Sequence, residues 1–316
     1  MLDLVTLGEA LVIFSPATSG PLRFVHTFAK SVGGAEANVA IALSRLGFKA
    51  GWVSRLGDDE FGRYIEYALK GEGIDLSQVK LDPTRPTGIL FKEQYQSSNP
   101  TVYYYRKGAA VTTMGATDIA ESYIAQAKIL HLTGILPALS DENHAATFQA
   151  LQYAKQHGVC ISFDPNLRLK LWDRTTAKAT LLAMVPYADI ILPGLDEAEF
   201  LLGLSEPSSI CAQFHAMGCK TVVLKLGKAG CLISDGNEII KVDGYTVHNL
   251  VDTVGAGDGF AAGFLAGILS HKPLRECGEL ANGVGAMATL VGGDSEGYPS
   301  MRQLLEFTGK ANAVER

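Results

Sequence analysis

The chain has 316 residues, of which 47% are hydrophobic, so it can build a full core in one large domain or two unequal ones. Charged residues make up 19%, the formal net charge is −6, and both signs are spread along the chain without a basic block. This balance argues against nucleic acid and anionic membranes as partners, although a local site can still bind a polyanion.

The cysteines and the N-terminus indicate a soluble, cytoplasmic protein. The five cysteines form no CxxC pair and no zinc-site spacing, which is typical of reduced thiols. The N-terminal segment carries Asp3 and Glu9 and lacks the basic region of a signal peptide. The longest apolar run, 260–269, is far shorter than the roughly 20 residues of a membrane span.

The N-terminal part of the chain alternates strands and helices. The run Leu4–Leu7 predicts a buried strand, and a turn-rich β segment follows it. Apolar residues at helical spacing predict a helix over 35–46, which Gly47 ends. The next strand is expected around Trp52 and the next helix over 58–69.

The segment 87–111 has a different pattern. Alternating apolar and aromatic residues, including the tyrosines 103–105, predict a β-hairpin with a turn at 99–100. Neither this segment nor 12–31 contains a helix that could cross over a sheet. We therefore expect the two segments to form a small β lid inserted into the larger domain.

From residue 112 onward strands and helices alternate, which predicts a mostly parallel central sheet with helices on both faces. The expected strands are 129–132, 160–163, 190–192 and 221–225, with a hairpin over 231–234 and 239–242. The expected helices include 142–157, 176–184, 256–269 and 274–291. The fold class is therefore α/β, with residues 1–11, 32–86 and 112–316 in one domain and 12–31 and 87–111 in the lid.

The segment 252–260 (DTVGAGDGF) carries the strongest functional motif. Its glycines stand where an apolar helix begins, so the backbone can approach a ligand and the free N–H groups can attract an anion. Asp258, fixed at that point, could accept a proton from a substrate hydroxyl. The alternative is a helix of small residues packed tightly on a sheet. No Walker A motif is present, and 283–288, which fits GxGxx[GA], lies inside a helical pattern and indicates helix packing.

Two separated signatures point to a family. Segment 33–40 (GGAEANVA) fits G-G-x-x-x-N-x-A, and segment 252–258 fits D-T-x-G-A-G-D. The chain resembles the PfkB-type, ribokinase-like sugar kinases over essentially its whole length. The resemblance implies a ribokinase-like fold with ATP and Mg²⁺ as cofactors, and a monovalent cation as a further option. It implies that Asp258 is the general base and that Gly255, Ala256 and Gly257 form an anion hole. It also implies that Gly33, Gly34 and Asn38 bind the substrate.

The position of Asp258 creates a tension with this role. A helix N-terminus favours the charged carboxylate, which weakens it as a base. Phosphoryl transfer tolerates a weak base, because its transition state is loose and depends more on positioning and charge neutralisation. We therefore expect a weakly basic Asp258 in a site that works mainly by electrostatics.

The segment 164–168 (DPNLR) follows an expected strand, and ligands of such sheets bind beyond the carboxyl ends of strands. From the residues alone, it is most simply an Asp-Pro turn with a surface arginine. The family has D-x-N-x-R here, which implies that Asn166 lies near the phosphates and that Arg168 lies near the substrate or the γ-phosphate.

The resemblance also assigns residues to the nucleotide and the metal. Glu197 matches the glutamate of the family motif N-x-x-E, which orients Mg²⁺ through water, whereas Gly194 stands at the usual asparagine. A glutamate in the first turn of a helix can also be only a partner of the helix dipole. The family's turn beside the nucleotide corresponds to Lys225, Gly227, Lys228 and Gly230. Its position beside the adenine corresponds to Asn282.

The stretch 103–110 (YYYRKGAA) is informative about the sugar. Arginine suits a carboxylate and tyrosine hydroxyls suit sugar hydroxyls. This stretch, 131–135 and 293–297 resemble 2-keto-3-deoxygluconate kinases, which phosphorylate a six-carbon keto acid. The resemblance places Gly34, Tyr103, Tyr105, Arg106, Ile135, Arg168 and Asp294 around the substrate. The tyrosines could instead form an ordinary aromatic strand or a subunit contact, since lids of this family pair in dimers, and we expect a homo-oligomer.

Three other functions compete with this interpretation. A fructokinase or related ketose kinase shares every motif except the argument for a carboxylate. A catalytically silent sugar-binding protein on the same scaffold is disfavoured by the intact Asp258. A nicotinamide dehydrogenase needs a strand, GxGxxG and helix near the start, which Gly33 and Gly34 do not supply.

Overall fold

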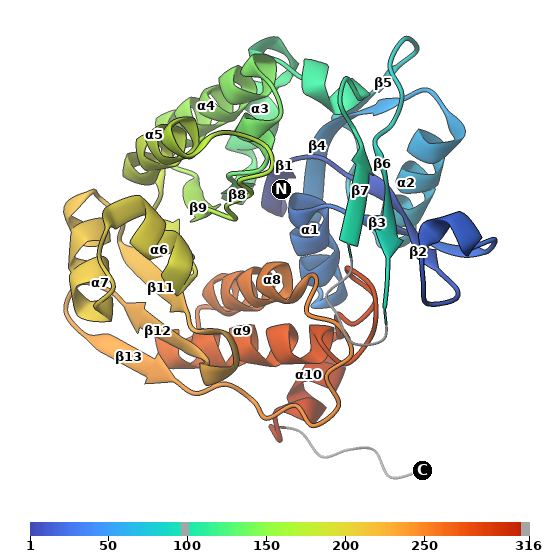
Figure 1. Ribbon diagram of the computed structural model, residues 1–316. Helices are drawn as coiled ribbons and strands as arrows, with labels where there is room; N and C mark the ends of the chain where they lie inside the picture. Colours follow the sequence, from blue (N-terminus) through green and yellow to red (C-terminus); the bar gives the residue numbers. More distant parts are fainter. Residues whose placement is uncertain (96–100, 311–316) are drawn as a thin grey trace.

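The computed structural model describes residues 1–95 and 101–310. Its centre is a nine-stranded sheet in the order β13-β12-β11-β10-β9-β8-β1-β4-β5, parallel from β11 to β5 and antiparallel at β12 and β13 (Figure 1). The strands are β1 (Leu2–Leu7), β4 (Ala50–Gly57), β5 (Val79–Asp82), β8 (Ala127–Thr133), β9 (Cys160–Asp164), β10 (Ile190–Ile191), β11 (Thr221–Lys225), β12 (Cys231–Ser234) and β13 (Ile239–Val242). The predicted α/β class is confirmed.

Helices cover both faces of this sheet, because successive strand residues point to opposite sides. Leu4 packs in one core while Val5 packs in the other. The first core is covered by α1 (Ala35–Arg45), α2 (Glu60–Gly71), α8 (Ala256–Leu269), α9 (Leu274–Ala288) and α10 (Met301–Phe307). The second is covered by α3 (Glu121–Ala125), α4 (Asp141–Gln156), α5 (Arg174–Met184), α6 (Leu195–Leu202) and α7 (Pro207–Ala216).

Glycines let α8 and α9 pack closely, as the two orange-red helices of Figure 1 show. A Cβ added at Gly263 would lie 2.7 Å from the Leu280 carbonyl oxygen. The segment 283–288 lies within α9, and a Cβ at Gly283 would lie 2.7 Å from Leu304 Cδ1 of α10. Its interpretation as a packing motif is therefore confirmed.

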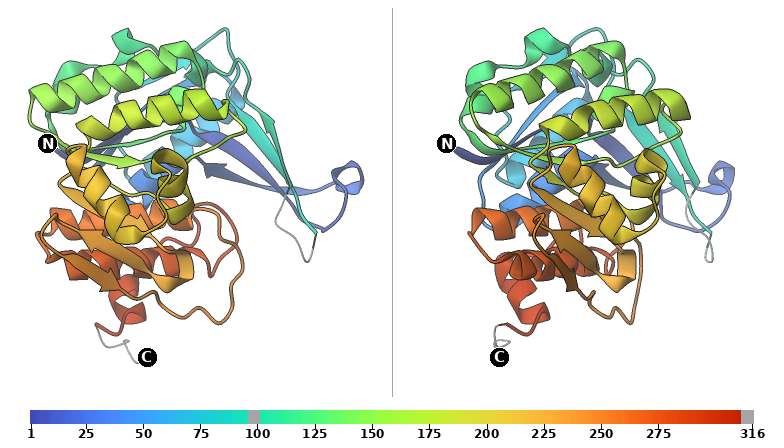
Figure 2. Two further views of the ribbon diagram at one scale, coloured as in Figure 1. Left: turned by 60° about the vertical axis from the view of Figure 1, so that its left-hand side comes forward. Right: turned by 90° about the vertical axis from the view of Figure 1, so that its left-hand side faces the viewer.

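A second sheet of four strands, called the lid below, projects from this body in both views of Figure 2. Its order is β3-β2-β6-β7, and its strands are β2 (Leu11–Pro16), β3 (Phe28–Gly33), β6 (Ile89–Glu93) and β7 (Thr101–Tyr105). The expected hairpin is present as β6 and β7, and the turn at 99–100 lies outside the described residues. Ala109 and Val111, which the sequence placed in the lid, are buried in the core of the body.

Most predicted elements agree with the structure within two residues. The hairpin β12–β13 and helix α8 have the predicted bounds, whereas the helix expected over 274–291 ends at Ala288. Gly292 and Gly293 follow soon after, and Gly293 has a φ of 127°, which a helix cannot accommodate. In the described ranges, no helix has both the length and the apolar character that crossing a membrane requires.

Candidate active site

A cavity of about 460 Å³ lies between the carboxyl ends of the central strands, the starts of α1 and α8, and the lid. Such a position follows from the topology, since loops at the carboxyl ends of parallel strands meet at one edge of the sheet. The predicted site residues that line it are Gly33, Gly34, Asn38, Arg106, Ile135, Asn166, Arg168, Glu197, Lys225, Gly255, Gly257, Asp258 and Asp294. The fold therefore brings most of the predicted site residues together.

Asp258 lies in the first turn of α8 and is held by two amides. Asn38 Nδ2 donates to its Oδ2 at 2.9 Å, and Asn166 Nδ2 lies 3.4 Å from its Oδ1. The pKa of Asp258 is raised to about 7, chiefly by burial and also by the Asp164 carboxylate. The hydrogen bond from Asn38 and the charges of Arg168 and Lys225 oppose this increase. The expectation of a weakly basic aspartate is wrong, because desolvation outweighs the helix N-terminus.

The start of α8 forms an open anion-binding turn. Gly255 precedes the helix with a left-handed φ of 76° and has no side chain that could cap the first N–H groups. No atom lies within 4 Å of a Cβ added at Gly257, so the space beside this turn is free. Gly255 and Gly257 line the cavity, whereas Ala256 is not among its lining residues. The turn can therefore accept an anion at the helix N-terminus.

Asp164 and Lys225 form a buried ion pair beneath this turn. Lys225 Nζ lies 2.6 Å from Asp164 Oδ2, and Asp164 is 1% exposed. The pair links the ends of β9 and β11, the two strands on either side of β10. Asp164 Oδ1 also accepts the Asn166 N–H at 3.1 Å. Asn166 has a φ of 39°, a left-handed conformation that asparagine tolerates better than most residues. Both Asn166 and Lys225 face the cavity.

Glu197 connects the loop after β9 to the start of α6. Its Oε1 accepts the Leu167 N–H and its Oε2 accepts the Gly194 N–H, each at 2.7 Å. A Cβ at Gly194 would lie 3.4 Å from Glu197 Oε2, so glycine leaves space that an asparagine would fill. In the two described ranges, no group of three His, Cys, Asp or Glu side chains could hold a metal. A contact to nucleotide-bound Mg²⁺ through water fits this single carboxylate.

The lid contributes the face of β6 and β7 that carries Leu90, Lys92, Val102, Tyr104 and Arg106. Tyr103 and Tyr105 point away from the cavity. Their placement around the substrate is therefore corrected, since side chains alternate along a strand and Tyr104 takes the inner position.

The outer face of the lid explains where these two tyrosines go. Tyr103 donates its hydroxyl to Glu93 at 3.3 Å, and the Tyr105 ring packs edge-on against Phe91 with 6.0 Å between centroids. The alternation was recognised in the sequence, but the choice of face depends on the pairing of β6 with β2, which the sequence does not reveal.

Two ion pairs join the lid to the body inside the cavity. Arg106 Nη1 lies 2.6 Å from Glu9 Oε2, and Lys92 Nζ lies 2.9 Å from Asp294 Oδ1. Glu9 and Lys92 were missed as site residues. Their partners are 97 and 202 positions away in the chain, so no local sequence pattern pairs them.

The cavity floor is rich in unused hydrogen-bond acceptors. Glu36 is fully buried, and burial raises its pKa to about 8, against the hydrogen bond that Thr133 donates at 2.5 Å. Buried side-chain oxygen atoms that make no hydrogen bond with the described residues are Glu9 Oε1, Glu36 Oε2, Asn38 Oδ1 and Asn166 Oδ1. Such acceptors suit a ligand with several hydroxyl groups.

Some residues assigned to the nucleotide lie outside this cavity. Asn282 is buried and donates to the carbonyl oxygens of Val242 and Asp243 at 3.2 and 3.1 Å, so it holds the end of β13. Its placement beside the adenine stays a prediction. Gly227 and Lys228 lie in the 3₁₀ turn after β11, and Gly230 has a φ of 96° where the chain turns into β12.

Comparison with known proteins identifies the family. The family described as pfkB family carbohydrate kinase matches residues 1–301. The chain is 38% identical to a 2-dehydro-3-deoxygluconokinase of Bacillus subtilis (strain 168), over 100% of this chain and 98% of that enzyme. It is 37% identical, over 97% of the chain and 94% of the relative, to an enzyme of the same name from Thermoproteus tenax. A fructokinase-1 of Zea mays is 32% identical, with 97% and 98% covered.

Solved structures agree with this result. A PfkB protein from Polaromonas sp. JS666 is 37% identical and superposes with a TM-score of 0.90 over 96% of this chain and 99% of that one. A putative ribokinase II from E. coli, in complex with ATP and Mg²⁺, is 27% identical with a TM-score of 0.92 over 98% and 100%. The chain belongs to the pfkB family of carbohydrate kinases and is a sugar kinase.

Proposed function

We propose that the chain transfers the γ-phosphoryl group of ATP to 2-keto-3-deoxygluconate and produces 2-keto-3-deoxy-6-phosphogluconate. The observation that carries the proposal is a single cavity that joins Asp258, the open turn before α8 and two arginine side chains. Relatives with this named activity are 37% and 38% identical over nearly their whole length, compared with 32% for the fructokinase.

In the proposed mechanism, Asp258 accepts the proton of the attacking 6-hydroxyl group while that oxygen bonds to the γ-phosphorus and ADP leaves. A pKa of about 7 suits this task, because the carboxylate is about half ionised near neutral pH and is a stronger base than an ordinary aspartate. The first-turn N–H groups after Gly255 and the positive charge of Lys225 stabilise the transferring phosphate. Bound Mg²⁺ neutralises phosphate charge, and Glu197 would hold one of its waters.

The charges in the cavity suggest how an acid is distinguished from a neutral sugar. Arg106 already faces Glu9, whereas Arg168 makes no ion pair with an acidic side chain of the described residues. A substrate carboxylate would therefore meet Arg168 as the unneutralised cation, with Arg106 as a hydrogen-bond donor beside it. A neutral ketose needs neither charge.

The test of the substrate is a comparison of kcat/KM for the keto acid and for fructose with saturating MgATP. We expect the acid to exceed fructose by at least about tenfold, a modest discrimination for one charged contact. Arg168→Gln should lower kcat/KM for the acid far more than for fructose. If the unaltered chain preferred fructose, the proposed keto-acid substrate would be wrong, and the alternative function of a ketose kinase would remain.

The test of the base is Asp258→Asn. Turnover should fall by a factor of about 10² to 10⁴, the usual contribution of general acid–base catalysis, while calorimetry still detects ATP binding. Asp141→Asn is the matched control, since Asp141 is an exposed aspartate in the first turn of α4, away from the cavity. Near-normal turnover in Asp258→Asn would overturn the assignment.

We also propose that two chains pair through the outer faces of their lids. Tyr103 and Tyr105 are 43% and 64% exposed there, beside aromatic residues of β2 and β6. Aromatic side chains exposed together are typical of an interface. Sedimentation should report a dimer, and Tyr105→Glu should shift it toward the monomer; a monomeric unaltered chain would contradict the pairing.

A further inference from the structure

A buried tyrosine lies directly behind the anion-binding turn. Tyr298 belongs to the segment between α9 and α10 and is 4% exposed. Its hydroxyl donates to the Gly255 carbonyl oxygen at 2.8 Å. Burial raises its pKa well above the usual value, so the hydroxyl remains a donor throughout the accessible pH range.

Gly255 is the residue whose conformation sets the direction of the first turn of α8. Its left-handed φ of 76° differs from the helical backbone that follows. An added Cβ would overlap the Asp294 carbonyl oxygen and would lie 2.8 Å from the Tyr298 hydroxyl. The segment 294–298 therefore packs directly against Gly255, with Asp294 lining the cavity and Tyr298 outside its lining.

This segment is itself fixed to the body. Arg45, at the end of α1, donates to the carbonyl oxygens of Ser295 and Tyr298 at 2.7 and 3.1 Å. The other guanidinium N–H groups bind the Glu72 carboxylate at 2.7 and 2.9 Å. The Tyr298 hydroxyl is thus anchored at its own backbone, which gives its hydrogen bond a defined direction.

The Gly255 carbonyl oxygen has a hydrogen-bond donor even without the Tyr298 hydroxyl. The same oxygen accepts the first helical hydrogen bond, from the Gly259 N–H at 2.9 Å. Loss of the tyrosine hydroxyl would therefore leave the carbonyl paired, so the cost to global stability should be small. What would change is the restraint on the backbone at Gly255.

We propose that Tyr298 is a positioning residue for phosphoryl transfer, which fixes the Gly255 turn so that the N–H groups after it point at the transferring phosphate. This inference rests on the proposed role of the turn as an anion hole. Preorganised donors stabilise a transition state only when their direction is fixed in advance, and small displacements of such groups are costly.

The test is Tyr298→Phe, which removes one oxygen and keeps the ring against Gly259. We expect kcat to fall about tenfold, the equivalent of one hydrogen bond, with the KM of the sugar within about twofold of the original. The Kd of ADP with aluminium fluoride, a mimic of the transferring phosphoryl group, should rise about tenfold in the presence of sugar, whereas the Kd of ADP alone should not change.

Tyr123→Phe is the matched control, since Tyr123 is 6% exposed and donates its hydroxyl to Asp75 at 3.1 Å, away from the cavity. This variant should change Tm as much as Tyr298→Phe or more and leave kcat and both Kd values unchanged. A lower Tm with unchanged kcat in Tyr298→Phe would reduce Tyr298 to a stabilising residue and overturn the proposal.

Two assays on Asp258→Asn and Tyr298→Phe separate this inference from the proposed function. If Asp258→Asn loses turnover and Tyr298→Phe does not, the positioning role alone fails. If Asp258→Asn retains turnover and Tyr298→Phe does not, the assignment of the base fails and the positioning role remains. Both variants are assayed with whichever of the keto acid and fructose the unaltered chain uses better, so the sugar's identity does not affect the result.

Discussion

At the scale of single residues, Asp258 shows how the fold sets the chemistry of a side chain. The helix start would lower its pKa, but the surrounding protein removes water from the carboxylate and raises the pKa to about 7. Asn38 counteracts this effect with a hydrogen bond at 2.9 Å, which favours the ionised form. The pKa of the base therefore reflects burial, which raises it most, and opposing contacts, of which the hydrogen bond from Asn38 is the largest.

Asn38→Ala tests this balance. Since a base acts when it is deprotonated, kcat/KM should fall as the pH drops through the pKa of Asp258, near 7 in the unaltered chain. Loss of the amide raises that pKa, so the acidic limb should move to higher pH and activity at pH 6.5 should suffer more than activity at pH 9. A pH-rate profile that only scales down by a constant factor would contradict the argument.

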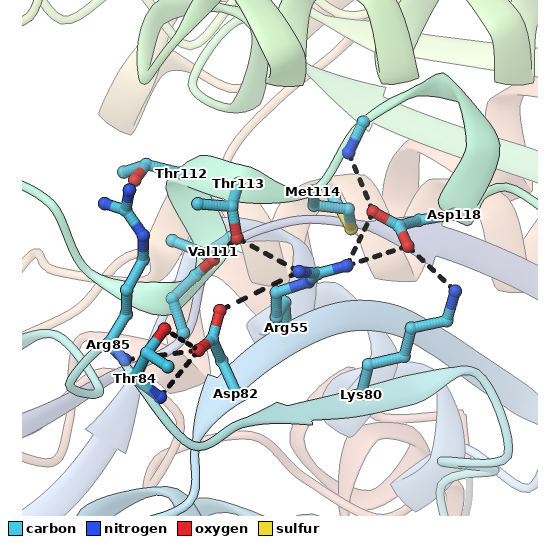
Figure 3. Close-up of polar contacts among 12 residues, drawn as sticks. Arg55, Lys80, Asp82, Thr84, Arg85, Val111, Thr112, Thr113, Met114 and Asp118 are labelled. Carbon is cyan, nitrogen blue, oxygen red and sulfur yellow. Dashed lines mark hydrogen bonds and ion pairs between the residues drawn. The ribbon is translucent and has the colours of Figure 1, made fainter.

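At the scale of elements, a polar cluster beneath the lid joins segments that are far apart in sequence. Figure 3 shows Arg55 of β4 between Asp82 on one side and Asp118 on the other. It lies 2.8 Å from Asp118, 3.8 Å from Asp82 and 3.3 Å from the Thr113 hydroxyl. Lys80 of β5 reaches the same Asp118 at 2.8 Å from a more exposed position.

Arg55→Ala and Lys80→Ala should therefore differ in stability. Arg55 is 24% exposed and its loss leaves the nearly buried Asp118 with fewer donors, so the free energy of unfolding should fall by about 1–2 kcal/mol. Lys80 is 51% exposed, and its loss should cost less than about 0.5 kcal/mol. Urea denaturation of both variants measures the difference; equal losses would show that burial does not separate the two pairs.

The elements were largely predictable because their signals are local. The hairpin β12–β13 follows from alternating residues around Asp235-Gly236, and α8 follows from its glycine-rich start. The sequence motifs correctly singled out Asp258, Asn38 and the turn after β9 as residues that meet in one cavity. Contacts between distant segments were not predictable, because the pairing of Arg106 with Glu9 depends on the register of strands that meet only in the folded chain.

The same limit applies to Asn282 and the tyrosines. The family resemblance singled out Asn282 on a late helix but did not give the direction of its amide, which donates to the end of β13. The inward position of Tyr104, and not of Tyr103 or Tyr105, follows from the pairing of β2 with β6. In both cases the residue type was informative and its direction needed the fold.

At the scale of the whole molecule, the lid has little core of its own. Its cluster of buried hydrophobic residues consists of Leu11, Ile13 and Leu90, whereas the body has two large cores. Figure 2 shows the lid projecting from the body. Val12 and Val32 of the lid pack in the first core of the body. The ion pairs Lys92–Asp294 and Arg106–Glu9 add polar contacts between the lid and the body inside the cavity.

Lys92→Met should loosen the lid without unfolding the body. Lys92 is 8% exposed, so its methylene groups remain packed in the variant while Asp294 loses its charged partner. Local opening should become easier by about 1.4 kcal/mol, or about tenfold in the amide hydrogen exchange rate. Mass spectrometry of peptides that cover β6 and β7 measures this rate, with peptides from β8 and β9 as the internal reference.

Lys128→Met is the control for that experiment, because Lys128 is 53% exposed and pairs with Asp3 on the surface of the body. It should leave exchange in the lid unchanged. The KM of the sugar should rise in Lys92→Met and not in Lys128→Met, since a lid that opens more often encloses the substrate for less of the time. Two results would contradict a role of this ion pair in holding the lid. One is an unchanged amide exchange rate in β6 and β7 of Lys92→Met, and the other is an equal increase of that rate in β8 and β9.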